Sequence, residues 1–90
     1  MTLVTDAINH IGLAALGRKV NKWPSAVQRW RDLNRLPQTD LLGITDYAHL
    51  IEEVSGGKYL AADLLECSRA QWRSDVARRA AIAKSKRAIP

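Results

Sequence analysis

The sequence predicts an all-α domain of five to six helices, with a helix-turn-helix in its first half. Apolar residues recur every three or four positions along most of the 90 residues, which is the period of an amphipathic helix. Runs of alternating β-branched residues, which are typical of strands, do not occur. Glycine, proline and asparagine separate the periodic stretches and indicate where helices end.

The first two predicted helices lie on either side of Gly12. Thr2 or Thr5 can cap the first helix, because a threonine hydroxyl accepts a free backbone N–H of the first turn. Its apolar positions are Leu3, Val4, Ala7, Ile8 and Ile11. The second helix is predicted over residues 13–20, with one apolar face formed by Leu13, Leu16 and Val20.

A third helix is predicted to begin at Pro24, after a turn at Asn21. Asparagine tolerates the left-handed backbone that a sharp turn needs, and proline fits the first turn of a helix, where its missing N–H costs nothing. The expected core face is Ala26, Val27, Trp30 and Leu33. Asn34 can end this helix, and Pro37 prevents its continuation.

Beyond Pro37 the helix signals are weaker. Residues 38–44 are expected to form a loop or a single helical turn. A fourth helix is expected to begin near Thr45, as its cap, and to end before Gly56-Gly57. A short fifth helix follows over residues 58–66. A last helix is expected to begin at Ser68, because Gln71 stands three residues later and completes a capping box.

This pattern divides the chain into three regions: a helix-turn-helix domain at 1–67, a C-terminal helix at 68–85 and a basic, disordered tail at 86–90. Trp72 and Val76 lie on one side of the C-terminal helix. They are candidate dimer contacts, because this helix can dock against the same helix of a second subunit. The alternative is that Trp72 packs on its own domain.

Positive charge is clustered along the chain. The formal net charge is +5, and residues 67–90 contain seven lysines or arginines against the single acidic residue Asp75. Residues 1–45 are also basic, whereas residues 46–66 are acidic. Clustered cations favour a polyanionic partner, because binding to phosphates releases condensed counterions.

Several classes of protein are excluded by what the sequence lacks. One cysteine, Cys67, cannot form a disulfide framework and fits a reducing cytosol. No apolar run approaches the roughly 18 residues of a membrane span, and residues 1–6 do not resemble a signal peptide. We therefore expect a cytoplasmic protein with no membrane partner.

No catalytic or metal-binding pattern is present either. His10 and His49 are far apart and share no zinc-ligand spacing with Cys67. Gly56-Gly57 is explained as a helix end rather than a phosphate loop, and Glu52-Glu53 diverge on a helix and cannot converge on one bond. We expect no enzymatic activity, no cofactor and no metal.

The segment from Leu13 to Trp30 has the spacing of two helices around a tight turn. Leu16 and Val20 lie where the first helix must meet the second, and Gly17 is small where the two backbones approach most closely. Val27 and Trp30 then point back into the shared core from the second helix. Helices that cross at a large angle over a three- to four-residue turn can share a core only through such positions.

The opposite side of the third helix is polar and can enter a DNA major groove. Helical spacing places the candidate base-contacting residues there: Ser25, Gln28, Arg29 and Asp32. Arg29 can bond to guanine O6 and N7, and Gln28 to adenine N6 and N7. The candidate phosphate contacts, which fix position rather than sequence, are Arg18, Lys19, Lys22, Arg31 and Arg35. The alternative is an ordinary solvated helix face.

The run Pro24 to Trp30 resembles the recognition helix of the lambda-repressor/Cro-like helix-turn-helix family. Arg35-Leu36-Pro37 is similar to the exit of that family into its fourth helix. The layout also resembles short phage-type Cro or YdaS-like regulators, and the resemblance extends over residues 8–59. It implies a lambda-repressor-like fold, double-stranded DNA as partner and a homodimer.

Two residues depart from the family pattern. Lys22 stands where an apolar residue is usual, and Trp23 replaces the usual Ser or Thr cap. The turn register is therefore open at this point, with a turn that is one residue longer as the alternative. Trp23 either covers the turn, the interpretation we favour from the sequence, or stands exposed and touches a DNA sugar or a thymine methyl group.

The leading functional hypothesis is a sequence-specific transcriptional regulator, a Cro-like repressor from a phage or mobile element. One alternative is a DNA-binding subunit of a phage DNA-processing machine, such as a terminase small subunit or an excisionase. Another is a protein-interaction module such as an antitoxin, which would use Trp72 and the acidic central region.

Overall fold

Six helices form within residues 2–87, the part of the chain that this computed structural model describes; side-chain surroundings are described as far as Ile82. In chain order the helices are α1 (Leu3–Ile11), α2 (Leu13–Val20), α3 (Pro24–Leu33), α4 (Gln38–Leu41), α5 (Tyr47–Val54) and α6 (Ala61–Arg87). No strand occurs within residues 2–87. The predicted all-α class is therefore confirmed, and residues 38–44 do contain a single helical turn.

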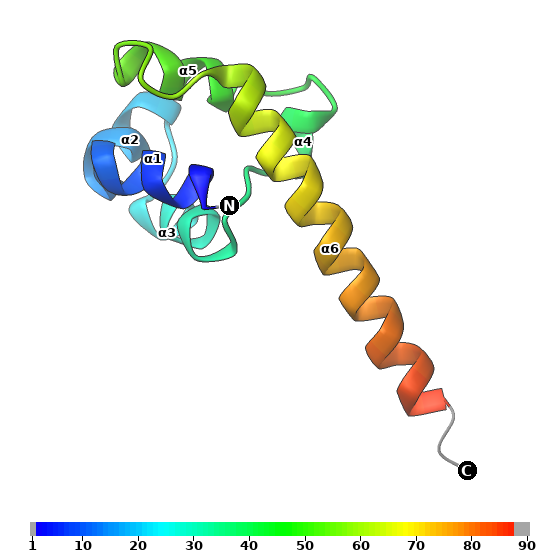
Figure 1. Cartoon of the computed structure of the whole chain (residues 1–90). Coiled ribbons are helices and arrows are strands. Elements are labelled where there is room, and N and C mark those ends of the chain that lie inside the picture. The colour runs from blue at the N-terminus through cyan, green and yellow to red at the C-terminus, as the bar shows by residue number, and fades with distance from the viewer. Residues whose placement is uncertain (1, 88–90) are drawn as a thin grey trace.

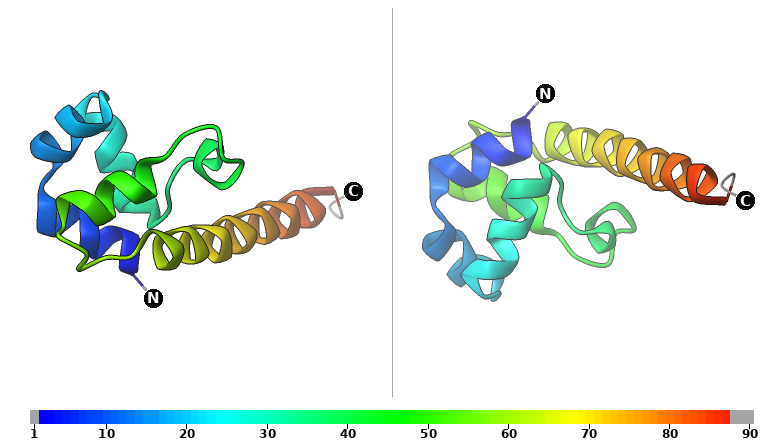
Figure 2. Two further views of the ribbon diagram at one scale, coloured as in Figure 1. Left: turned by 90° about the horizontal axis from the view of Figure 1, so that it is seen from above. Right: turned by 90° about the horizontal axis from the view of Figure 1, so that it is seen from below.

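The hydrophobic core lies between α1, α2, α3, α5 and the first turns of α6. Its largest fully buried apolar side chains are Ile8, Leu16, Leu36, Ile51, Leu64, Val4 and Val27. Figure 1 shows the short helices gathered at one end of the molecule, with α6 leaving them. The two views of Figure 2 agree that the second half of α6 extends beyond the bundle, and the molecule measures 54 Å along its longest axis and 24 Å across.

Helix α6 is one continuous helix, so the predicted break between residues 66 and 68 is wrong. Ser68 is buried inside it and starts no helix: its hydroxyl donates to the carbonyl of Leu64 at 2.8 Å and accepts the N–H of Leu36 at 3.0 Å. The true start is at Ala61, whose N–H donates to the Glu52 side chain at 2.9 Å. No glycine or proline interrupts residues 61–87, so nothing in that stretch ends the helix.

The C-terminal tail also differs from the prediction. Helix α6 continues to Arg87, past the expected end at residue 85, so the first two residues of the predicted disordered tail at 86–90 are helical. Residues 88–90 lie outside the described residues.

The N-terminal cap of α5 comes from α4 and not from Thr45, as the sequence had suggested. The buried carboxylate of Asp40 accepts the N–H groups of Tyr47 at 2.7 Å and of Ala48 at 3.1 Å. The Thr45 hydroxyl donates to the same carboxylate at 2.9 Å. A carboxylate at this place satisfies free N–H groups and complements the positive end of the helix dipole.

Helix α1 holds the last turn of α3. Of the two predicted caps, Thr2 precedes α1 without a side-chain capping bond. The hydroxyl of Thr5 donates instead to the carbonyl of Arg31 at 2.6 Å, and its N–H donates to the Asn34 side chain at 3.1 Å. Asn34 ends α3 in the left-handed conformation, with φ of 54°, as predicted. These bonds fix the C-terminal end of α3 relative to the bundle.

Candidate nucleic-acid interface

A tight turn joins α2 to α3, as the sequence predicts. Asn21 ends α2 with φ of 57° and ψ of 48°, and the N–H of Lys22 donates to the carbonyl of Gly17 at 2.9 Å. A Cβ atom on Gly17 would lie 2.9 Å from the carbonyl oxygen of Lys22 and 3.6 Å from the nitrogen of Pro24. The expectation that glycine is needed where the backbones approach is therefore confirmed.

Trp23 occupies the cap position of α3 but contributes no side-chain cap. Its carbonyl accepts the N–H groups of Ala26 at 3.0 Å and Val27 at 3.4 Å, so Pro24 is the first helical residue, as expected. The Trp23 side chain is 82% exposed, which overturns the interpretation that it covers the turn. It lines a shallow hollow together with Arg18, Lys22 and neighbouring residues of α2.

The inner face of α3 is anchored in the core. Val27 is fully buried and Trp30 is 8% exposed, and the Trp30 ring stacks on Tyr47 of α5 with centroids 4.8 Å apart. Such a contact adds to the stabilisation that comes from burying the rings. The predicted core role of Val27 and Trp30 is confirmed, and these two side chains determine which side of α3 faces outward.

The outer face of α3 carries the four residues predicted to contact bases. Ser25, Gln28, Arg29 and Asp32 are all exposed, and they line one shallow hollow. The structure therefore brings the predicted set together on one surface. Asp32 also forms an ion pair with the adjacent Arg31 at 3.3 Å.

Three of the predicted phosphate-binding residues lie beside the start of α3. Arg18 and Lys19 are exposed in the last turn of α2, and Lys22 is exposed in the turn. The fourth, Arg31, is partly buried. The cations of α2 and of the turn thus flank the N-terminal end of the polar surface of α3.

Comparison with known proteins identifies the family. No family model and no solved structure matches the chain. The sequence is 39% identical over 67 residues to the 8.4 kDa cro protein of Escherichia phage HK022, an alignment that covers 74% of this chain and 88% of that protein. The chain belongs to the phage Cro family. The predicted resemblance is confirmed, and with it the prediction of a DNA-binding repressor rather than an enzyme.

Arg35 of this Cro-family chain is not available to phosphates, which corrects its predicted role. It is 5% exposed and forms an ion pair with Asp75 of α6. Its guanidinium carbon lies 3.5 Å from the centroid of the Trp72 ring. The left-handed turn at Asn34 directs the chain back into the bundle, where the N–H of Arg35 donates to the carbonyl of Trp30 at 3.1 Å. Sequence reasoning missed Asp75 because it lies 40 residues away.

Trp72 makes contacts within its own chain, and its role as a dimer contact stays a prediction. Its indole N–H donates to the carbonyl of Leu36 at 2.9 Å, and its ring covers Arg35. Trp72 therefore attaches α6 to the segment that follows α3, as in the alternative left open by the sequence. Val76, the other candidate, remains 57% exposed.

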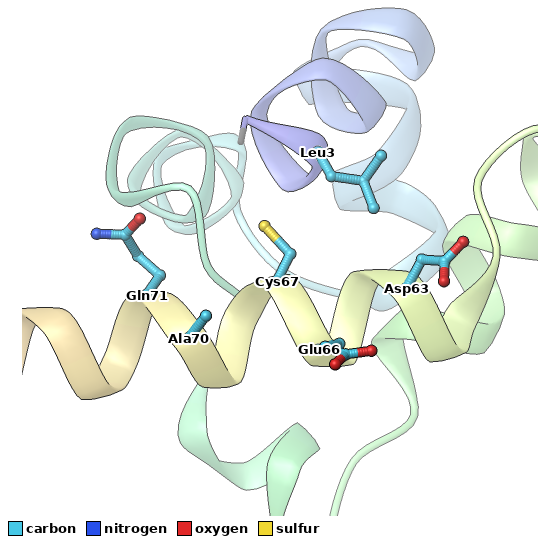
Figure 3. A pocket seen from close by; sticks show the side chains of 6 residues that line it. All are labelled: Leu3, Asp63, Glu66, Cys67, Ala70 and Gln71. Carbon is cyan, nitrogen blue, oxygen red and sulfur yellow. The ribbon is translucent and has the colours of Figure 1, made fainter.

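The remaining titratable side chains form no recognisable second centre. Within the described part of the chain no three His, Cys, Asp or Glu residues are grouped to hold a metal, and none of its helices is long and apolar enough to cross a membrane. Figure 3 shows a pocket between α1 and α6, where Cys67 lies close to Leu3, with Asp63 and Glu66 along the same helix. Its two carboxylates make it unsuited to phosphate.

Proposed function

We propose that this Cro-family protein represses transcription by placing α3 in the major groove of a specific operator and so occluding a promoter. The observation that carries the proposal is the two-sided character of α3. Val27 and Trp30 are buried beneath it, and Gln28 and Arg29 are exposed above it. The major groove admits one α-helix, and a helix presented in this way reads bases with its outer side chains.

The outer side chains match base edges by their hydrogen-bonding chemistry. Arg29 donates two bonds to guanine O6 and N7, and Gln28 bonds to adenine N7 and N6. Asp32 can accept from cytosine N4, and Ser25 suits a base or a phosphate. Each good two-bond pair contributes about 1–3 kcal/mol of discrimination against a wrong base.

The cations beside α3 supply affinity without sequence preference. Arg18, Lys19 and Lys22 lie exposed at the junction of α2 with the turn, and Arg31 lies on α3 itself. Contacts of this kind with phosphates set the position of a protein along the duplex. The exposed ring of Trp23 lies at the same junction and packs against a sugar or a thymine methyl group.

The test compares two matched variants by fluorescence anisotropy, on the DNA upstream of the protein's own gene and on random DNA, over a salt series. Arg29→Ala is expected to remove a preference of roughly 5- to 150-fold for the specific site, which corresponds to the loss of about 1–3 kcal/mol. Lys19→Ala is expected to weaken binding to both DNAs alike. Equal weakening of both DNAs by Arg29→Ala would contradict the proposal.

We further propose that the protein binds as a homodimer in the host cytoplasm, where its operator lies. Two half-sites one helical turn apart are read by two copies of α3, and a symmetric pair has a self-complementary interface.

Val76 and Ile82 are exposed apolar side chains on α6, at 57% and 51%. Val76→Asp should shift the sedimenting species toward the monomer, whereas the control Ala77→Asp should not; an unchanged mass for both excludes this interface.

A further inference from the structure

Helix α6 contributes an arginine to the surface of α3 that faces outward. Arg79 is exposed, and it lines the same hollow as Ser25, Gln28, Arg29 and Asp32. It lies more than forty residues further along the chain than any of these side chains. Arg79 reaches the hollow on α3 because of the path that α6 takes past the end of α3.

Three contacts determine that path. Arg35 pairs with Asp75, the Trp72 indole donates to the carbonyl of Leu36 at 2.9 Å, and the Ser68 hydroxyl accepts the N–H of Leu36 at 3.0 Å. All three join α6 to Arg35 and Leu36, which follow the left-handed residue Asn34. Arg79 lies one helical turn beyond Asp75 and therefore on the same side of α6.

The charges in this hollow suit an anion. Arg29, Arg35 and Arg79 all line it. Arg35 is paired with Asp75, and the carboxylate of Asp32 is paired with Arg31. Guanidinium groups bind phosphate oxygens with two parallel bonds. With Arg29 directed at a base edge, the guanidinium of Arg79 is the one left for a phosphate oxygen beside the groove.

The position of Arg79 complements that of the α2 cations. Arg18, Lys19 and Lys22 flank the N-terminal end of α3, whereas α6 passes its C-terminal end, where Arg35 is buried. Figures 1 and 2 show α6 leaving the bundle beside the segment that follows α3. A helix in the major groove lies between two sugar-phosphate backbones.

We infer that Arg79 binds a phosphate of the duplex on the α6 side of the groove, in the place that the sequence assigns to Arg35. This inference rests on the proposed function, since it requires α3 to lie in the groove. Helix α6 thereby becomes part of the DNA-binding surface, and the protein contacts backbone at both ends of α3.

The test uses Arg79→Gln with Arg73→Gln as the matched control. Arg73 is also an exposed arginine of α6, but it stands two residues before Asp75 and so on the opposite face. Binding to specific and random DNA is measured by anisotropy between low and moderate salt. The association constant K falls as salt rises, so the slope of log K against log salt is negative. Loss of one phosphate contact makes this slope less steep by about 0.9 and weakens binding roughly tenfold at 0.1 M salt.

We expect Arg79→Gln to show this loss on both DNAs and Arg79→Lys to keep most of the wild-type slope. The control Arg73→Gln should bind both DNAs like the wild-type protein. An unchanged slope for Arg79→Gln, or equal losses for both glutamine variants, overturns the inference. If the wild-type protein prefers its specific site, Arg29→Ala removes that preference and Arg79→Gln has no effect on binding, only this inference fails. If the unchanged protein binds no DNA, the proposed function fails with it.

Discussion

The α2–α3 turn and helix α6 place basic side chains beside α3 by different means. The turn is held by neighbours in sequence, since the N–H of Lys22 reaches the carbonyl of Gly17. Helix α6 is held by partners that lie 32 to 40 residues away: Ser68 on Leu36, Trp72 on Leu36 and Asp75 on Arg35. Backbone geometry decides the first placement. The second depends on the buried apolar residues at the start of α6, such as Leu64, and on these side-chain pairs beyond them.

The comparison predicts that the two regions fail independently. Loss of a side-chain partner should loosen α6 beyond its buried first turns and leave the helix-turn-helix in place, whereas crowding of the turn should misalign α3 and leave α6 attached. Three substitutions test this separation.

Arg35→Ala should have the largest effect on stability. It removes the ion-pair partner of the Asp75 carboxylate, which is 17% exposed and keeps the amide of Gln71 as a donor at 3.0 Å. Breaking a buried pair typically costs about 3–5 kcal/mol. We expect the free energy of unfolding in urea to fall by about 3 kcal/mol, with faster amide hydrogen exchange in residues 68–82 than in residues 13–33.

A double variant serves as the control for this prediction. Arg35→Met combined with Asp75→Leu removes both charges, and apolar replacements of a buried pair are often neutral or stabilising. Stability should therefore return toward that of the unchanged protein. A loss below about 1 kcal/mol for Arg35→Ala alone would show that α6 does not depend on this pair.

Gly17→Ala should have an intermediate effect, confined to the turn. Its new Cβ would lie 2.9 Å from the carbonyl oxygen of Lys22, so backbone must shift, and overpacking of this kind costs about 1–3 kcal/mol. Urea unfolding measures the loss, and Ala14→Gly in the same helix controls for helix propensity. Wild-type stability in Gly17→Ala would mean that the turn is looser than the contact implies.

Asn21→Gly should have the smallest effect. Both residues adopt the left-handed backbone, and φ at Asn21 is 57°, so the change should stay within about 0.5 kcal/mol. Asn21→Val, which cannot adopt this conformation without strain, should cost about 1–2 kcal/mol. Similar urea unfolding midpoints for Asn21→Gly and Asn21→Val would contradict the view that the left-handed backbone at position 21 limits which residue fits the turn.

The same contrast explains what the sequence could and could not predict. Gly17, Asn21 and Pro24 specify the turn through local backbone rules, and Val27 with Trp30 specifies the buried side of α3, so this part was predictable. Arg35 was misassigned because an arginine in a basic segment normally lies in solvent, and nothing near it in sequence indicates Asp75.

Two further errors have the same origin. Ser68 and Gln71 have the spacing of a capping box, but the hydroxyl of Ser68 is engaged by Leu36 and Leu64 inside a continuous helix. The cap of α5 was assigned to Thr45, whereas Asp40 supplies it from a helix of a single turn. In both cases the partner that decides the local structure is brought by the tertiary fold.

The bonds from Thr5 to Arg31 and Asn34 connect α1 with the orientation of α3. A substitution in the first turn of α1 would therefore tilt α3 without altering any of its exposed side chains. The direction of α3 is therefore set in part by a threonine hydroxyl that lies outside the helix-turn-helix itself.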